Sequence, residues 1–306
     1  MYDVIIIGAG PAGISRAIYA SRAGLKTLVL EKEAVGGQIA LTDSCENYPG
    51  NIEDLSGLEL ADNMRKQAVH FGAEFKYDAI KEADLEGKVK VLKSRRNVYE
   101  SKAVIIATGA SPRMLNVKGE SEFIGRGVGF CAVCDAPFYK GSHIYVVGGG
   151  NSAADEAIYL SNFGSKITIL VRDEKLIASQ IYIDKINSNE KIEVIYNTEV
   201  VEIKGEDMVS GLILRNNKTG KIKEVSEEGI GVFIFVGRIP ETNIFEGQIE
   251  MENGYILADE DMKTNLDGVY VAGDVRKKKL RQVVTATSDG AIAGEACGKY
   301  LEGIND

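Results

Sequence analysis

The stretch that decides the fold is residues 1–33, MYDVIIIGAGPAGISRAIYASRAGLKTLVLEKE. Its apolar run Val4–Ile7 predicts a buried strand, and a glycine-rich turn follows. Apolar residues at helical spacing then predict a helix over Pro11–Ala23, and Thr27–Leu30 predicts a second strand. The chain therefore opens with a strand–helix–strand unit whose two strands are parallel.

The turn of this unit has the spacing G-x-G-x-x-G, formed by Gly8, Gly10 and Gly13. The first glycine permits the tight turn, the second lets the backbone approach a pyrophosphate, and the third lets helix and strand pack closely. Glu31 follows the second strand, where an acid can accept a hydrogen bond from a ribose hydroxyl. A glycine turn that binds nothing is the alternative, but the acid in register favours a dinucleotide.

The same pattern restarts in the middle of the chain. His143–Val147 predicts a strand, Gly148–Ala153 a glycine turn, Asp155–Phe163 a helix and Lys166–Val171 a strand. The sequence therefore predicts an α/β fold class with two Rossmann-like nucleotide-binding domains, each doubly wound and three-layered.

Two turn-forming segments mark where the chain crosses between these domains. They are Ser111–Arg113 and Gly237–Thr242, and each follows an apolar strand pattern. We therefore expect the second domain, 114–241, to be inserted into the first, which consists of 1–113 and 242–306.

Composition narrows the classes of partner. The 306 residues carry a net charge of -9, which disfavours binding to nucleic acid. No apolar run approaches the ~20 residues that span a bilayer, and Met1 leads into the first strand without a charged leader. We expect a cytoplasmic protein that does not enter a membrane.

Four cysteines occur, and Cys131 and Cys134 form a C-x-x-C pair followed by Asp135. A structural zinc site needs four ligands, and the sequence offers no second pair, so we expect no metal. In a redox pair one thiol has a lowered pKa and the second resolves a mixed disulfide, while an adjacent acid can exchange protons. Two buried structural cysteines are the alternative. Cys45 and Cys297 are expected to be packing residues.

The C-terminal part contains a further strand pattern, Gly268–Ala272, followed by Gly273 and Asp274. A helical pattern follows over Gln282–Tyr300. Because α/β folds bind ligands at the carboxyl ends of their strands, Asp274 could hold a polyol such as the ribityl chain of a flavin, or could cap a turn.

Taken together, these motifs resemble the low-molecular-weight thioredoxin reductase family over essentially the whole chain. The segments that carry the resemblance are GAGPAG at 8–13, GGQ at 36–38, ENYPG at 46–50, ATG at 107–109, CAVCD at 131–135 and the run from Gly273 to Ala286. In that family the first domain holds FAD, the inserted domain holds NADPH and the C-x-x-C, and the protein is a homodimer.

The resemblance implies a flavin-dependent thioredoxin-disulfide reductase, with thioredoxin as its partner. It implies that Cys134 lies next to the flavin, that Cys131 attacks the disulfide of thioredoxin, and that Asp135 is the general acid. The residues that it implies for FAD binding are Gly8, Gly10, Pro11, Ala12, Gly13, Glu31, Gly37, Gln38, Asn47, Thr108, Gly109, Gly273, Asp274, Arg281, Gln282 and Val283.

The inserted domain departs from the family pattern. NADPH-dependent members carry a histidine and two arginines after the second strand, and a further arginine four residues on, which grip the 2′-phosphate. Here Val171 replaces the histidine, Asp173 the second arginine and Ile177 the outer arginine, and Glu174 adds a second acid. NADPH use is therefore doubtful. NADH is an alternative, although apolar Val171 occupies the position that matches Glu31.

We therefore predict reduced ferredoxin as the electron donor, as in the ferredoxin-dependent flavin thioredoxin reductases. Ferredoxins are acidic, and the run Arg276–Lys279 with Arg281 is the densest basic segment for docking one, unless it is only a solvated loop. An ordinary NAD(P)H-dependent thioredoxin reductase is the alternative. A non-enzymatic flavin-binding redox sensor is the alternative of another class.

Overall fold

The computed structural model describes residues 1–41, 45, 47–50 and 55–304. By its internal contacts the chain divides into two units, which are described separately: unit 1 consists of 1–111 and 239–306, and unit 2 of 112–238. The expected crossings, after residues 113 and 241, differ from these boundaries by two and three residues. Which cofactor each unit binds stays a prediction.

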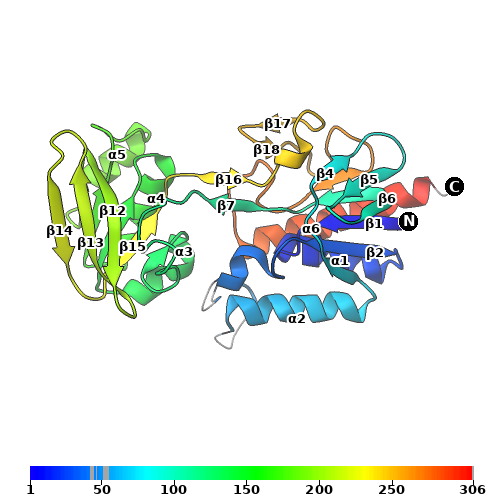
Figure 1. Ribbon diagram of the computed structural model, residues 1–306, viewed down its shortest axis with the longest axis horizontal. Helices are drawn as coiled ribbons and strands as arrows, with labels where there is room; N and C mark the ends of the chain where they lie inside the picture. Colours follow the sequence, from blue (N-terminus) through cyan, green and yellow to red (C-terminus); the bar gives the residue numbers. More distant parts are fainter. Residues whose placement is uncertain (42–44, 46, 51–54, 305–306) are drawn as a thin grey trace. The chain divides into compact units, whose positions relative to one another are not determined.

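Unit 1 is built on a parallel sheet in the order β3-β2-β1-β6, with β19 beside β6 and with β5 and β4 continuing the sheet in antiparallel fashion (Figure 1). The register pairs Val4 with Thr27 on one side and with Ala103 on the other. The strands of this sheet are β1 Tyr2–Ile7, β2 Thr27–Glu31, β3 Glu74–Tyr77, β4 Glu82–Asp84, β5 Lys90–Lys93, β6 Val98–Ile106 and β19 Val269–Val271.

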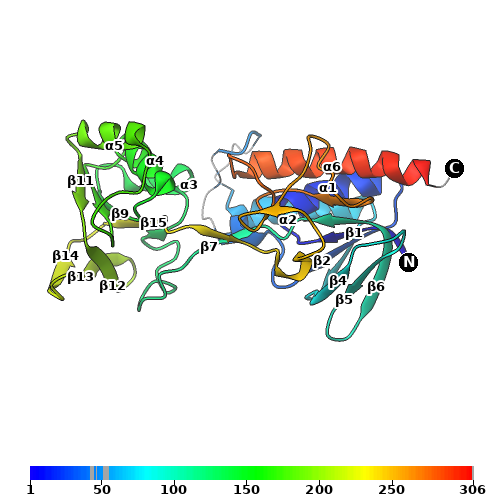
Figure 2. The same cartoon turned by 90° about the horizontal axis from the view of Figure 1, so that it is seen from above.

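Three helices pack on one face of this sheet, where α1 and α6 lie side by side (Figure 2). They are α1 Pro11–Arg22, α2 Gly57–His70 and α6 Val283–Gly303. The opposite face of the parallel strands packs against the antiparallel extension β5–β4 of the same sheet and against the segment around η3, so the parallel strands lie between two layers. The remaining short elements of unit 1 and of the crossings are η1 Gly37–Leu41, β7 Ala110–Pro112, β16 Arg238–Pro240, η3 Asn243–Phe245, β17 Met251–Glu252 and β18 Tyr255–Ile256.

The helix starts of unit 1 follow from local chemistry. Pro11 occupies the first position of α1, where its missing N–H costs no hydrogen bond. Ser56 caps α2 through a capping box in which its hydroxyl accepts from the Glu59 N–H and the Glu59 carboxylate accepts from the Ser56 N–H. Both helices are therefore fixed at their first turns by residues next to them in sequence.

Unit 2 repeats the design with a parallel sheet in the order β11-β10-β9-β15-β8. Helices α3, α4 and α5 pack on one face, and an antiparallel sheet, β12-β13-β14, covers the other. The elements of unit 2 are β8 Val128–Gly129, α3 Ala132–Asp135, η2 Ala136–Tyr139, β9 His143–Val147, α4 Asn151–Leu160, β10 Lys166–Leu170, α5 Gln180–Asn187, β11 Ile192–Ile195, β12 Thr198–Gly205, β13 Val209–Asn216, β14 Ile222–Ser226 and β15 Gly231–Ile234.

The predicted α/β class with Rossmann-like parallel sheets is confirmed. One element differs clearly, because α4 begins at Asn151, four residues before the predicted start, and ends at Leu160. It begins there because Gly150 is extended and serves as the N-cap, and it ends early because Phe163 and Gly164 both donate to the Leu160 carbonyl. Within the described ranges no helix is long and apolar enough to cross a membrane.

Candidate functional site

The first glycine turn forms an open cradle at the start of α1. A Cβ on Gly8, whose φ is +107°, would lie 2.4 Å from the Ala107 carbonyl oxygen, and one on Gly13 would lie 2.0 Å from the Gly8 oxygen. A Cβ on Gly10 would meet nothing closer than the Gly36 oxygen at 4.0 Å. The fold itself therefore requires Gly8 and Gly13, whereas Gly10 leaves space that a ligand can fill.

The polar groups around this cradle suit a phosphate and a ribose. Among the described residues no side chain caps the N-terminus of α1, so the N–H groups of its first turn are available to an anion. The Glu31 carboxylate lies at the end of β2 and accepts from the Ala9 N–H at 2.7 Å and from the Glu33 N–H at 3.0 Å. Glu31 thus stabilises the first glycine turn through these two hydrogen bonds, and it is also the residue predicted to bind a ribose.

Two more of the predicted residues border the same cradle. A Cβ on Gly37 would lie 3.5 Å from the Gly10 Cα, and one on Gly273 would lie 2.9 Å from the Ala12 Cβ. Gly273 follows β19, so the end of that strand meets the start of α1, as expected for the carboxyl edge of a parallel sheet.

Other predicted flavin contacts also meet in unit 1. The Gln38 side chain donates to the Ala110 carbonyl, directly after Thr108 and Gly109. Asn47 Nδ2 donates to Gln282 Oε1 at 3.1 Å, which joins the segment after η1 to the start of α6 and Val283. Glu46, which belongs to one of the motifs, lies outside the described residues.

The side chain of Arg281 suggests that a ligand binds nearby in unit 1. Its guanidinium carbon lies 4.4 Å from the centre of the Tyr255 ring, and its buried Nε has no hydrogen-bond partner among the described residues. A buried donor without an acceptor is costly, so a bound group that brings an acceptor would stabilise this arrangement. The residues of unit 1 therefore fit a large, partly anionic cofactor.

The redox pair lies at the start of α3 in unit 2. Cys131 and Cys134 are joined as a disulfide with their Cα atoms 5.3 Å apart, and Cys131 Sγ accepts from the Cys134 N–H at 3.3 Å. Asp135 ends the helix, and a Cβ on Gly129 would lie only 2.8 Å from its Oδ2. Glycine at 129 therefore makes room for a carboxylate beside the disulfide.

Two groups near this pair were missed by sequence reasoning. Arg238 donates to the carbonyl of Phe130, the residue before Cys131, at 3.4 Å. Glu156 lies on α4, against which α3 packs. Burial, then repulsion by Asp155, raises the pKa of Glu156 to about 7, although Arg238 opposes the shift. Neither residue belongs to a motif that sequence reasoning could use. The burial of Glu156 follows only from the packing of α4.

The second glycine turn has the same geometry as the first. A Cβ on Gly148, whose φ is +147°, would lie 2.5 Å from the Phe235 oxygen, whereas one on Gly150 would meet nothing within 4 Å. No side chain within the described part of the chain caps the N-terminus of α4. Unit 2 thus keeps both the open cradle and the exposed N–H groups of a pyrophosphate site.

The basic run considered for docking ferredoxin is largely engaged in ion pairs within the chain. Arg276 Nε and Lys278 Nζ lie 2.9 and 2.7 Å from Asp289 Oδ2, and the Lys278 side chain is only 6% exposed. Lys277 pairs with Glu252. From sequence alone a charged run is expected to be exposed to solvent. Here the buried carboxylate of Asp289 on α6 binds two of its cations, Arg276 and Lys278.

Asp289 was also missed, since an acid inside a helix carries no signal of burial. Its carboxylate accepts from the Gly273 N–H at 3.0 Å as well as from the two cations. Burial alone would raise the pKa of Asp289, but the hydrogen bonds from Arg276 and Lys278 outweigh it and hold the pKa below its usual value of 3.8. Asp289 thus fixes the glycine that borders the first cradle.

The other two cysteines, Cys45 and Cys297, belong to unit 1 and are buried, at 4% and 0% exposure. Burial raises the pKa of both the Cys45 and the Cys297 thiol, which disfavours the reactive thiolate. In the part of the chain that the structure describes, no group of three or more His, Cys, Asp or Glu side chains could hold a metal ion.

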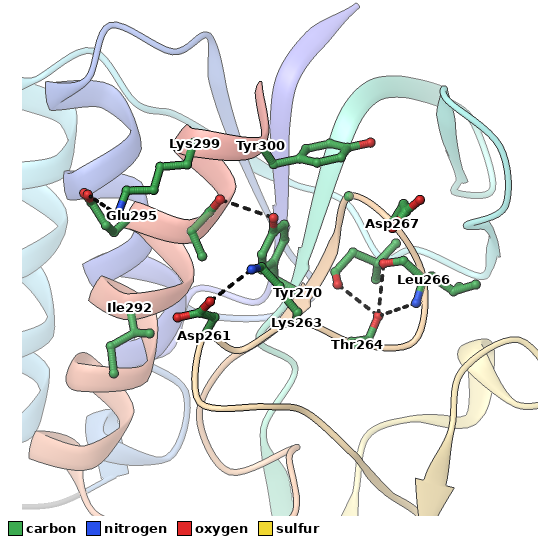
Figure 3. Close-up of a pocket in the computed structure, with 13 residues that line it drawn as sticks. Asp261, Lys263, Thr264, Leu266, Asp267, Tyr270, Ile292, Glu295, Lys299 and Tyr300 are labelled. Atoms are coloured by element: carbon green, nitrogen blue, oxygen red, sulfur yellow. Dashed lines mark hydrogen bonds and ion pairs between the residues drawn. The ribbon is translucent and has the colours of Figure 1, made fainter. Parts of the chain in front are cut away.

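A cavity of about 480 Å³ lies in unit 1 between α6 and the loop before β19 (Figure 3). Four of its charged lining residues form two ion pairs, Lys263 with Asp261 at 3.0 Å and Lys299 with Glu295 at 3.2 Å, and Asp267 is the fifth. None of the predicted site residues is among those that line it. The cavity is therefore separate from the first cradle.

Comparison with known proteins agrees with this geometry. The sequence profile described as pyridine nucleotide-disulphide oxidoreductase matches residues 2–290. A thioredoxin reductase of Peptoclostridium acidaminophilum is 45% identical over 307 residues, which cover 99% of this chain and 98% of that protein. The chain belongs to the low-molecular-weight thioredoxin reductase family. Among solved structures of the family, that of thioredoxin reductase from Streptococcus pyogenes MGAS5005 is similar with a TM-score of 0.93 and 42% identity, covering 99% of each chain.

The predicted place in the ferredoxin-dependent branch is not supported. A ferredoxin-flavin thioredoxin reductase from Clostridium acetobutylicum is 29% identical with a TM-score of 0.53, although 99% of this chain and 98% of that one are covered. The thioredoxin reductases named above are much more similar in sequence. The prediction relied too heavily on three changed positions after β10, Val171, Asp173 and Ile177. A few residues can change while the rest of a chain stays similar to its relatives.

Proposed function

We propose that this protein is an FAD-containing thioredoxin-disulfide reductase that takes its electrons from a reduced pyridine nucleotide. Membership in a pyridine nucleotide-disulphide oxidoreductase family and the names of the similar proteins support this donor over ferredoxin. The observation that carries the proposal is the Cys131–Cys134 disulfide, held beside an acid in a unit that also keeps a pyrophosphate cradle.

FAD fits the residues of unit 1. The pyrophosphate would lie on the first turn of α1 opposite Gly10, the ribose near Glu31, and the flavin near Asn47, Arg281 and the start of α6. When bound, FAD supplies a carrier that accepts two electrons from the nucleotide and returns them to a disulfide. Around it, Asp289 holds Gly273 in place, and the N-terminus of α6 favours negative charge nearby.

The chemistry of the dithiol is done by three residues of unit 2. After reduction, the Cys131 thiolate attacks one sulfur of the thioredoxin disulfide, which forms a mixed disulfide and releases the other thioredoxin sulfur as a thiolate. Cys134 then attacks Cys131, which restores the internal disulfide and releases the second thioredoxin sulfur. Asp135 serves as the general acid that passes a proton to a departing thiolate.

Thioredoxin is accordingly the proposed protein partner, and a homodimer the proposed assembly. Both rest on the family resemblance. Sedimentation of the FAD-loaded protein tests the assembly: a mass near twice 33.1 kDa is expected, and a monomer at working concentration would overturn it.

The function is tested by chemically reducing the bound flavin under anaerobic conditions and then adding oxidised thioredoxin. We expect the visible flavin absorbance to return in proportion to the thioredoxin added. Cys134→Ser should bind FAD normally and show no return of absorbance. Cys297→Ala is the matched control, because it removes a buried thiol of the other unit and should behave like the unmodified protein. Full activity of Cys134→Ser would contradict the dithiol mechanism.

A further inference from the structure

The loop after β10, at the edge of the second cradle, carries acids where a site for a phosphorylated ribose would carry cations. What this loop implies about the nucleotide rests on the proposed function. The loop after β10 begins and ends on the glycine turn. A Cβ on Gly149 would lie 3.0 Å from Val171 Cγ1, and the Ile177 N–H donates to the Gly149 carbonyl at 2.8 Å. Residues 172–176 therefore form the edge of the cradle where the adenosine ribose of a dinucleotide lies.

Val171 cannot contact a ribose from this position. It is only 1% exposed and packs against Gly149 and the core of unit 2. The charged residues of the loop are the next four, Arg172 to Lys175, and all are exposed. The ribose therefore meets this charged edge, of which Asp173 is the first acid.

The loop is fixed in place by the turns that follow β11 and β13. The Asp173 carbonyl accepts from the Asn197 N–H at 3.0 Å, and the Arg172 carbonyl accepts from Asn217 Nδ2 at 2.9 Å. Lys218 Nζ lies 2.6 Å from the Glu174 carboxylate. The acids thus sit on a braced loop, which limits how far they could move away from a bound anion.

Two of the three cations at this edge, Arg172 and Lys218, lie against its two acids, and Lys175 is the third. Lys218 pairs with Glu174 and holds the pKa of that carboxyl below its usual value, so Glu174 is ionised. Arg172 Nε lies 3.6 Å from Asp173 Oδ2. A 2′-phosphate would have to displace these carboxylates from their partners and lie beside two negative charges, whereas a 2′-hydroxyl can donate a hydrogen bond to Asp173.

We propose that the nucleotide of this protein carries a free 2′-hydroxyl, so that NADH is its donor in preference to NADPH, and that Asp173 is the residue that discriminates. A single repulsion between unit charges about 4 Å apart is equivalent to roughly a fivefold change in affinity even in bulk water. Because Arg172, Lys175 and Lys218 offset part of the repulsion from the two acids, we expect a preference of about fivefold, the size of one such repulsion.

Binding of ADP-ribose and of 2′-phospho-ADP-ribose by calorimetry tests this without any electron transfer. The FAD-loaded protein should bind ADP-ribose about fivefold tighter than 2′-phospho-ADP-ribose. Asp173→Arg should reverse or abolish the preference, and Asp173→Asn should weaken it. Glu190→Arg is the matched control: it makes the same charge change at an exposed residue just before β11, at the opposite edge of the sheet, and should leave the preference unchanged.

The outcomes separate this inference from the proposed function. Tighter binding of 2′-phospho-ADP-ribose would overturn the inference and make NADPH the donor, while the thioredoxin reductase function would stand. Binding of neither probe would also overturn it. Failure of the proposed function would be seen in the other experiment. There the chemically reduced flavin would not be reoxidised by thioredoxin. Gly150→Ala should weaken binding of ADP-ribose, since its Cβ would project into the cradle without meeting protein atoms.

Discussion

Replacing Asp289 by Asn tests whether one buried carboxylate holds the carboxyl edge of unit 1 together. The Asp289 side chain is 5% exposed and binds Arg276, Lys278 and the Gly273 N–H. The amide keeps the size of the carboxylate but removes its charge, which leaves two largely buried cations without a counter-ion. Breaking a buried ion pair by removing one partner typically costs about 3 to 5 kcal/mol.

That cost is a large share of the roughly 5 to 15 kcal/mol by which a domain is stable. The measurement is urea unfolding with saturating FAD, followed by circular dichroism because the chain has no tryptophan. Glu295→Gln is the matched control on the same helix. Glu295 pairs with Lys299, but both side chains are about 70% exposed, so its loss should be below about 0.5 kcal/mol.

The pH dependence of this effect has a definite sign. The pKa of Asp289 in the folded protein lies below its usual value of 3.8, so its contribution is present above that value and is lost as the pH falls through the folded pKa. The difference between the unmodified protein and Asp289→Asn should be constant from about pH 6 to 8 and should shrink below about pH 4. A loss no larger than that of Glu295→Gln at pH 7 would refute the reasoning.

Three further substitutions probe the first cradle and the surroundings of the dithiol. Gly10→Ala should fold normally yet bind FAD weakly, whereas Gly13→Ala should destabilise the fold itself, because its Cβ would lie 2.0 Å from the Gly8 oxygen; flavin fluorescence and thermal melting separate the two. Gly298→Ala, in open space on α6, is their control and should stabilise by about 0.5 to 1 kcal/mol. Glu156 has a pKa raised to about 7, so its contribution is present below its usual pKa of 4.5 and is lost as the pH rises through about 7. Glu156→Gln should therefore flatten the fall in stability between pH 5 and 8, and equal slopes for both proteins would show that Glu156 is ionised throughout.

The two strand–turn–helix units could be predicted because their signals are local. Apolar runs, glycine spacing and Pro11 act within a few residues, and β1, α1 and β9 begin or end within two residues of expectation. The start of α4 could not be predicted, because the same glycine turn also fits a longer loop. Only the backbone conformation of Gly150 decides between them.

The long-range parts of the candidate site could not be read from the sequence. Arg276 and Lys278 look solvated in a basic run, and only the packing of α6 brings Asp289 to them. Val171 matches Glu31 by position, but in the structure it packs inward, and the acids that follow it form the edge of the cradle. These differences arise because burial of a charge depends on elements that are distant in sequence.

The central claim is that electrons pass from a pyridine nucleotide through bound flavin to the Cys131–Cys134 pair and on to thioredoxin. The most direct test mixes the FAD-loaded protein under anaerobic conditions with NADH, NADPH or reduced ferredoxin, follows the visible flavin absorbance, and then adds oxidised thioredoxin. We predict bleaching by NADH, slower bleaching by NADPH, and recovery on addition of thioredoxin. Bleaching by ferredoxin alone would contradict the account.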